Sequence, residues 1–303
     1  MFWALCSAIP VLLAGASGEL PAFPRVQVVP LPLCQFAFEV EGVEVLRYHC
    51  DDCVSKPYIF PLIGPAGRPV VRMGHPHDPH GHRHHLGIWV GHRDVNGSDF
   101  WSEGGGTRVA HVRVEEVRDG RDSASLMVCN RWVDAAGKAL MDEKRTVTLH
   151  ALEHGERYLD VALVLAPADG GVVLGKTPFG FLGVRVAKTM SANDGGGTIR
   201  NSEGAVNEEA VLWKRARWVD YTGRATPDED NGIALFDHPD NPGHPTYFHV
   251  RGDGWMGASF CFEAPCTLAE GETLELRYRL YVHGPNTLPE SIEKHWALFR
   301  NAP

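Results

Sequence analysis

The chain lacks the features that mark two large classes of proteins. It has no long run of Lys and Arg, and its 29 basic residues are outnumbered by 38 acidic residues, which gives a formal net charge of −9. Because a nucleic-acid-binding protein needs a basic face, we expect no nucleic-acid partner. Beyond the N-terminus, no apolar segment reaches the length of a membrane-spanning helix, so we expect no transmembrane segment in the mature chain.

Internal repeats, low-complexity tracts and linkers are also absent, and helical periodicity is rare. Only Pro289–Phe299 combines a proline near its start with apolar residues at helical spacing. Most of the chain consists of short runs that alternate apolar and polar residues, which is typical of strands with one buried face. The predicted strands are Arg25–Leu31, Gln35–Val40, Val43–Tyr48, Val109–Val117, Ser125–Val133, Lys144–Leu152, Tyr158–Leu165, Phe179–Ala187, Gly232–Phe236, Thr246–Val250 and Thr273–Val282. We therefore predict an all-β protein, a single large many-stranded β-sandwich over residues 19–303 with a short C-terminal helix.

The first 18 residues are apolar and end in small residues, as a secretory signal does. They contain no Lys or Arg, and the alternative is a buried N-terminal strand or helix. We predict a signal peptide over residues 1–18 and a periplasmic or secreted mature protein.

Seven cysteines are present, and Cys6 would leave with the signal peptide. Export would permit disulfides among the others, which are Cys34, Cys50, Cys53, Cys129, Cys261 and Cys266. The pair Cys50 and Cys53 is a lone CxxC, compatible with a tight disulfide, half of a zinc site or two unpaired thiols. Structural roles are favoured, and the pairing stays open.

Histidine is concentrated in one segment, because seven of the 16 histidines lie between His75 and His92. Prolines and a glycine predict a loop for the first half, where His80 and His82 fit a solvated polar loop. The cluster is compatible with one divalent metal ion or with acid–base chemistry. The candidate metal ligands are His75, His77 and His84.

The second half of this segment, His84–Arg93, predicts a strand whose side chains alternate between two faces. The first face is mostly apolar and carries His84, Leu86, Ile88, Val90 and His92. The second face carries His85, Gly87, Trp89, Gly91 and Arg93. Glycines on both sides of the indole leave space either for a ligand such as a sugar or for a second packed sheet.

Further polar residues are candidates for the same site. Asn96 and Asp99 follow the predicted strand, where they would bind hydroxyl groups or a cation, or cap a turn. Arg185 lies among apolar neighbours and needs an anionic partner, which would be a substrate or a structural carboxylate. The remaining candidates are Glu203, Asp220, Tyr221 and His249.

Several sequence blocks together resemble a bacterial family labelled PmoA-like, after a methane oxygenase. The blocks include Lys56-Pro-Tyr-Ile-Phe-Pro61, His84-His85-Leu-Gly-Ile-Trp89, Asp94-Val-Asn-Gly-Ser-Asp-Phe-Trp101, Asn201-Ser-Glu-Gly204 and Trp218-Val-Asp-Tyr-Thr-Gly223. Leu86 departs from the family pattern, in which Arg follows the histidine pair. The methane oxygenase subunit is an integral membrane protein, so methane oxidation is not expected of this chain. The strand pattern is also similar to galactose mutarotase-like sandwiches, and this resemblance implies a sugar ligand.

We therefore predict an exported enzyme that transfers protons on a small carbohydrate or an oxidised sugar, by epimerisation, mutarotation or β-elimination. His85 and His92 are the predicted acid–base groups, although strand parity places them on opposite faces unless the chain bends at Gly91. Arg185 would stabilise negative charge, and Glu203 would be a second base. The predicted binding residues are Trp89 and Trp101 by stacking, Asn96 and Asp99 through hydroxyl groups, and Asp220, Tyr221 and His249. The alternatives are a non-catalytic carbohydrate-binding protein and a histidine-ligated metalloenzyme.

Overall fold

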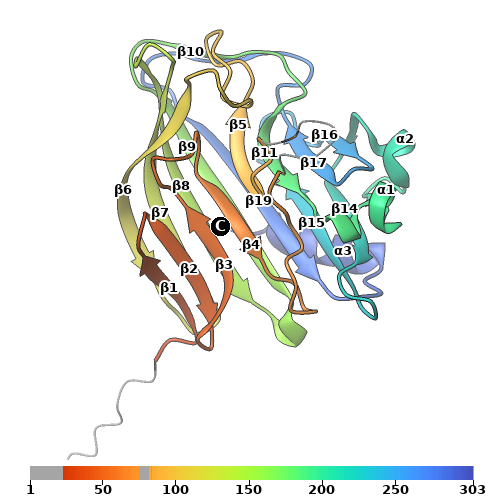
Figure 1. The fold of residues 1–303 in the computed structure, drawn as a ribbon. Coiled ribbons are helices and arrows are strands. Elements are labelled where there is room, and N and C mark those ends of the chain that lie inside the picture. Colours follow the sequence, from red (N-terminus) through yellow and green to blue (C-terminus); the bar gives the residue numbers. More distant parts are fainter. Residues whose placement is uncertain (1–22, 75–81, 83, 303) are drawn as a thin grey trace, which may run out of the picture.

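A computed structural model, which describes residues 23–74, 82 and 84–302, has two large sheets that lie face to face (Figure 1). In the nine-stranded sheet the order is β1 (Val26–Leu31), β2 (Gln35–Val40), β3 (Val43–His49), β4 (Tyr58–Leu62), β5 (Ile88–His92), β11 (Gly180–Arg185), β17 (Trp255–Ser259), β16 (Thr246–Arg251) and β13 (Lys214–Ala216). In the eight-stranded sheet the order is β12 (Thr198–Asn201), β14 (Trp218–Arg224), β15 (Asp230–Asp237), β19 (Leu274–His283), β9 (Arg157–Pro167), β8 (Ala139–Ala151), β7 (Ser123–Val133) and β6 (Arg108–Arg118). The all-β sandwich predicted from the sequence is confirmed.

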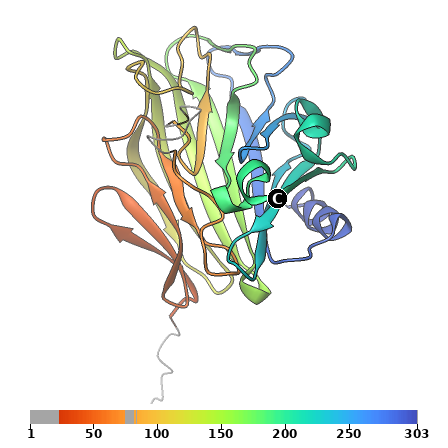
Figure 2. The same ribbon diagram turned by 45° about the vertical axis from the view of Figure 1, so that its right-hand side comes forward.

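The remaining elements are short. They are the two-stranded sheet of β10 (Val172–Leu174) and β18 (Cys266–Leu268), the helices α1 (Ala192–Gly195), α2 (Asn207–Val211) and α3 (Pro289–Phe299), and two 3₁₀ turns at Glu153–Gly155 and Lys188–Met190. Figure 2 shows α3 beside the eight-stranded sheet, as the sequence predicts for the C-terminal segment. None of the helices within the described ranges has the length and apolarity to cross a bilayer.

The core between the two sheets follows the alternation of the strands, as β19 illustrates. Leu276, Leu280 and Val282 lie in the main core cluster, which extends from Val26 to the end of β19. Tyr281 points to the opposite face, where it packs with residues of α3 in a second cluster. The helix α3 therefore covers the outer face of the eight-stranded sheet over β9, β14, β15 and β19.

One disulfide joins the turn before β2 to the end of β3. Cys34 and Cys50 are bonded, with 5.3 Å between their Cα atoms, whereas Cys53 is exposed and free. The CxxC is thus neither a tight disulfide nor a pair of free thiols, because its first cysteine pairs with Cys34.

Replacing Cys34 with serine is expected to lower the free energy of unfolding by about 3 kcal/mol. The disulfide joins two cysteines with a sequence separation of 16, and closing a loop of that length restricts the unfolded chain. Cys53→Ser is the matched control and should change it by less than about 0.5 kcal/mol. Urea unfolding under non-reducing conditions measures both values. Equal stability of the two variants would contradict a structural role for this disulfide.

Candidate functional site

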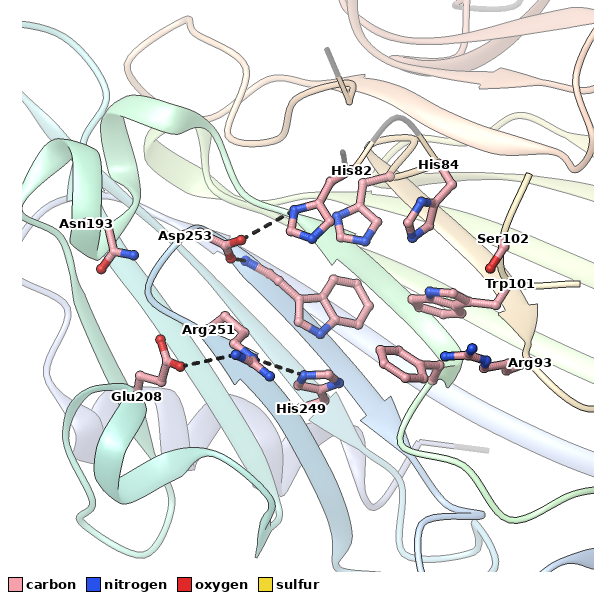
Figure 3. A pocket seen from close by; sticks show the side chains of 13 residues that line it. His82, His84, Arg93, Trp101, Ser102, Asn193, Glu208, His249, Arg251 and Asp253 are labelled. Atoms are coloured by element: carbon pink, nitrogen blue, oxygen red, sulfur yellow. Dashed lines mark hydrogen bonds and ion pairs between the residues drawn. The ribbon is translucent and has the colours of Figure 1, made fainter. Parts of the chain in front are cut away.

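A cavity of about 630 Å³ opens on the outer face of the nine-stranded sheet. Strand pairing places Trp89 of β5, Gly183 of β11 and Gly257 of β17 side by side on this face, and His249 of β16 stands next to them. The lining residues are His82, His84, His85, Arg93, Trp101, Ser102, Phe179, Asn193, Glu208, His249, Arg251, Asp253 and Trp255 (Figure 3). The site therefore combines four neighbouring strands with the loops that join them.

Three indole rings form the floor of the cavity. The ring centroids of Trp89, Trp101 and Trp255 lie 5.1–5.3 Å from one another. A Cβ atom at Gly183 would come within 2.8 Å of the Trp89 ring, and one at Gly257 within 2.6 Å of the Trp255 ring. Glycine is therefore required in β11 and β17 because the indoles lie directly over the sheet.

The glycines that flank Trp89 have a different role from the one expected for a ligand site. A Cβ atom at Gly87 would lie 2.3 Å from the Ile59 carbonyl oxygen, and one at Gly91 would lie 2.9 Å from the Phe100 carbonyl oxygen. Both glycines admit neighbouring backbone. The prediction that they leave space for a ligand beside Trp89 is wrong.

One side of the cavity is a group of three imidazoles, which we call the histidine wall: His82, His84 and His85. The His85 ring stacks on Trp89 and Trp255 at centroid distances of 5.0 and 5.1 Å. His82 stacks on His85 at 4.6 Å, and His84 meets it edge-on at 4.5 Å. The rings are thus held in fixed contact with the aromatic floor.

Two sequence predictions about this wall are corrected. His82 does not belong to a solvated loop, because it lies against His85 and lines the cavity. His84 is not on a core face, because it too lines the cavity. The regular strand begins only at Ile88, after Gly87 with a φ of 67°, so a period of two does not extend back to His84.

Behind the histidine wall, Asp253 in the turn between β16 and β17 contacts both His82 and Arg185. Its Oδ2 lies 3.5 Å from Nδ1 of His82, and its Oδ1 accepts a hydrogen bond of 2.9 Å from Nη1 of Arg185. Arg185 is fully buried, on the cavity face but beneath its lining. Its Nη2 also lies 3.3 Å from Nδ1 of His82, so Arg185 reaches the cavity through two lining residues, His82 and Asp253.

The opposite side of the cavity carries His249, Arg251 and Arg93, as Figure 3 shows. Arg251 Nε donates to His249 Nε2 at 3.3 Å, and Arg251 Nη1 lies 3.8 Å from Oε1 of Glu208. His249 Nδ1 lies 3.4 Å from the Pro178 carbonyl oxygen, to which it donates. The Arg93 guanidinium lies over the Phe179 ring at 5.1 Å. Both arginines are exposed at the cavity.

Burial keeps the imidazoles of this site neutral. It lowers the pKa of His84 to about 4, with a further contribution from the nearby ammonium of Lys56, and it lowers the pKa of His249 to about 4. The pKa of His85 is lowered far below its ordinary value, first by burial and then by neighbouring cationic groups. Burial also lowers the pKa of Lys56 to about 8, and its Nζ donates to the Trp101 carbonyl oxygen at 2.9 Å. At neutral pH the imidazoles of His84, His85 and His249 are therefore unprotonated.

Several predicted site residues lie elsewhere. His92 is buried on the core side, where Nε2 lies 2.9 Å from the Gly175 carbonyl oxygen, and no bend at Gly91 returns it to the cavity. Glu203 is exposed near Arg217. Asp220 is buried on the outer face of the eight-stranded sheet, bonded to His283. None of these three lines the cavity.

Other predicted residues support the cavity without lining it. Asn96 accepts a hydrogen bond from the Val173 amide, and Asp99 accepts from the Trp101 and Ser102 amides, which fixes the turn that carries Trp101. The hydroxyl of Tyr221 donates to the Arg251 carbonyl oxygen at 2.9 Å. Of the predicted residues, His84, His85, Trp101 and His249 line the cavity, and Trp89 lies in its floor.

Sequence reasoning missed Phe179, Glu208, Arg251, Asp253 and Trp255 as lining residues. Asp253 stands between two glycines, which is a turn signal, but nothing local shows that this turn faces His82. The others become neighbours only through strand pairing.

Replacing His92 with glutamine is expected to flatten the pH dependence of stability. Burial lowers the folded-state pKa of His92 to about 4, below about 6.5 in the unfolded chain. Its stabilising contribution is therefore present above about pH 6.5 and lost as the pH falls towards about 4. Between about pH 7 and about pH 4.5 the wild type should lose about 2–3 kcal/mol more than His92→Gln. Urea unfolding at both pH values measures this, and an unchanged slope would show that His92 is not buried in neutral form.

Of the three predicted metal ligands, the structure describes only His84, which belongs to the histidine wall. His75 and His77 lie outside the described residues. In the part of the chain that the structure describes, one group of three ligand side chains comes together within 4.8 Å, namely Cys34, Cys50 and His111. Its two cysteines form the disulfide. A divalent metal in the cavity stays a prediction.

Residues 35–297 match the family described as "Family of unknown function (DUF6807)". The chain belongs to this family. The family description names no activity and does not mention methane oxygenase, so the PmoA-like resemblance stays a prediction. No curated protein shows significant sequence similarity to this DUF6807 chain.

Solved structures with a similar arrangement include carbohydrate-active enzymes. Heparan sulfate lyase HepC from Pedobacter heparinus has a TM-score of 0.37 and 9% identity, over 84% of this chain and 31% of the lyase. A GalM/aldose epimerase homologue from C. elegans has a TM-score of 0.33 and 9% identity, over 85% of this chain and 98% of that chain. A putative kojibiose phosphorylase from human microbiome has a TM-score of 0.35 and 7% identity, over 92% of this chain and 37% of the phosphorylase chain. Similarity at these TM-scores assigns no chemistry to the DUF6807 chain, which spans about a third of the length of the lyase.

Proposed function

We propose that this protein is an exported enzyme that transfers protons on a sugar or an oxidised sugar, by epimerisation, mutarotation or β-elimination. The observation that carries the proposal is the two-sided cavity. An aromatic floor lies between the histidine wall on one side and His249 with Arg251 on the other. A binding site of this kind holds the apolar face of a sugar ring and brings proton-transfer groups to one of its edges and a guanidinium to the other.

Binding is assigned to the floor and the polar rim. Trp255 and Trp101 line the cavity but are each only 3% exposed, so a small part of each ring meets the C–H face of a pyranose, while Asn193, Glu208 and Arg93 face the hydroxyl groups. Arg251 is held by His249 and Glu208, so its guanidinium is already oriented before the sugar enters. This preorganisation lowers the cost of stabilising negative charge on a substrate oxygen.

Proton transfer is assigned to the imidazoles. His84 lines the cavity and is unprotonated at neutral pH, because burial lowers its pKa to about 4, so it is in the form that a general base needs towards substrate carbon or oxygen. His82 is oriented at Nδ1 by Arg185 and Asp253, which makes it the second proton-transfer group on the same side. On the opposite side both ring nitrogens of His249 already have partners, Arg251 and the Pro178 carbonyl oxygen, so His249 orients Arg251. A proton taken by His84 is returned by His82, and the two imidazoles act as a base and an acid.

Export remains part of the proposal, with a periplasmic or secreted location. The disulfide between Cys34 and Cys50 supports it, because such bonds persist in oxidising compartments.

The test is a screen of the purified protein against sugars and 3-keto-sugars in D₂O, with and without a chelator. Proton NMR reports exchange of carbon-bound hydrogen and anomer interconversion, and ultraviolet absorbance reports an unsaturated elimination product. Catalysis that survives chelation supports the proposal. Catalysis abolished by the chelator would favour the histidine-ligated metalloenzyme, and sugar binding without any turnover would favour a carbohydrate-binding protein.

A further inference from the structure

Trp213 differs from the other tryptophans of the described chain. Its exposed fraction is 43%, whereas the other six are at most 4% exposed. It lies between α2 and β13, and its φ of 55° is rare for a bulky residue. Its amide donates to the Phe248 carbonyl oxygen at 2.9 Å, which holds this backbone conformation. The chain therefore maintains an unfavourable conformation that presents an indole to solvent.

A second hollow of about 660 Å³ lies in front of this indole. It is lined by Lys176, Thr177, Pro178, Trp213, Phe262 and Glu263. The Phe262 ring lies 6.1 Å from Trp213 and stacks on Tyr247 at 4.5 Å. Glu263 is held in place by Arg215 at 2.7 Å. The hollow thus joins an aromatic surface to an ammonium group and an oriented carboxylate.

The second hollow shares a wall with the first cavity. Pro178 lines the second hollow, and the next residue, Phe179, lines the first. The Trp213 ring lies 5.9 Å from the ring of His249, which lines the first cavity and lies 5.3 Å from Phe179. A ligand of several linked units that fills the first cavity can therefore extend past His249 to Trp213.

We propose that the second hollow is a subsite for the next sugar unit, so that the ligand is an oligosaccharide. This inference rests on the proposed function, because it takes the first cavity to hold a sugar. An exposed indole stacks on the C–H face of a second pyranose, and the Lys176 ammonium and the Glu263 carboxylate bind its hydroxyl groups. The aromatic surface is continuous with the first cavity, and this continuity makes a second sugar unit its occupant.

The test uses two ladders of probes, each a monosaccharide, a disaccharide and a trisaccharide: gluco-oligosaccharides of the cellulose type and oligogalacturonates. Isothermal titration measures binding to wild type, Trp213→Ala, Trp213→Phe and Phe262→Ala. Leu298→Ala, at an exposed position on α3, is the control for a surface truncation. Circular dichroism confirms that each variant is folded, and Phe262→Ala replaces Trp213→Ala if the latter does not fold.

In the wild type we expect the disaccharide of one ladder to bind about tenfold more tightly than its monosaccharide. Trp213→Ala and Phe262→Ala should abolish this gain without changing monosaccharide binding, and Trp213→Phe should keep part of it. Equal binding of all lengths, or a gain that survives both alanine variants, overturns the subsite and leaves the proposed function standing. If no probe of either ladder binds, the sugar assignment of the first cavity is overturned, and the subsite with it.

Discussion

His84→Gln is expected to lower kcat by about 10²–10⁴-fold and to change sugar affinity by less than about threefold, because removing a general base raises the barrier of the chemical step. His84 lines the cavity, and its pKa, lowered to about 4, leaves it in the unprotonated form of a base across the neutral range. Glutamine keeps polarity and length but cannot take up a proton. Initial rates with a sugar from the screen, together with titration of binding, separate the two effects.

The pH profile gives a second readout of the same residue. Because the base must be unprotonated, kcat/KM of the wild type should fall as the pH drops through about 4. The matched control is His154→Gln, in which the replaced side chain is 90% exposed; its rate and profile should equal those of the wild type. A His84→Gln protein that keeps the wild-type kcat would refute the role of His84, and the same measurements on His82→Gln would then examine the imidazole that Asp253 orients.

The fold was predictable because it depends on local alternation. In β19 every second residue is apolar, and those residues lie in the core between the sheets. The helix α3 was predicted at Pro289–Phe299, where the structure has it, because both its N-terminal proline and its apolar spacing are local signals. Short strands that contain glycine or proline, such as β17 and β4, were not predicted. They have too few alternating apolar and polar residues to be distinguished from loops.

The site was predictable only where it is continuous in sequence. His85 and Trp89 were identified because both belong to one short segment. Asp253 and Arg251 were not, because their place around the cavity depends on the pairing of β5 with β11, of β11 with β17 and of β17 with β16, and strand register between distant segments is not encoded in any one of them.

Strand parity explains the residues that were placed incorrectly. Asp220 and Tyr221 are neighbours in β14 and were both assigned to the sugar site, but successive side chains point to opposite faces of a strand. Tyr221 points into the sandwich and bonds to the Arg251 carbonyl oxygen, whereas Asp220 points outward beneath α3. Within β5, parity also separates His92 from Trp89. The sequence could not show which face of which sheet becomes the site.

Asp220→Asn is expected to lower the free energy of unfolding by about 3–5 kcal/mol, because it removes one partner of a buried ion pair. Asp220 Oδ1 lies 2.9 Å from Nε2 of His283, and both side chains are fully buried. The second ring nitrogen of His283 faces the Gly284 carbonyl oxygen at 3.0 Å, so both nitrogens donate and the ring is an imidazolium. Space for the ring exists because Gly232 lies across from it, where a Cβ atom would be 2.0 Å away.

The pH dependence of the free energy of unfolding tests whether the loss in Asp220→Asn comes from the ion pair with His283. Burial alone would lower the pKa of His283, but the Asp220 carboxylate outweighs it and the pKa is raised. The contribution of the pair is therefore complete below about pH 6.5, the unfolded value, and declines as the pH rises through the folded-state pKa. The loss in free energy of unfolding caused by Asp220→Asn should accordingly be largest in acid and shrink in alkali, as urea unfolding across this range will measure.

The control is Asp228→Asn, at an exposed carboxylate in the loop after β14, whose free energy of unfolding should stay within about 0.5 kcal/mol of the wild-type value. Because Asp220 lies on the far sheet, Asp220→Asn protein that remains folded should retain the wild-type KM, and a raised KM would return Asp220 to the sugar site.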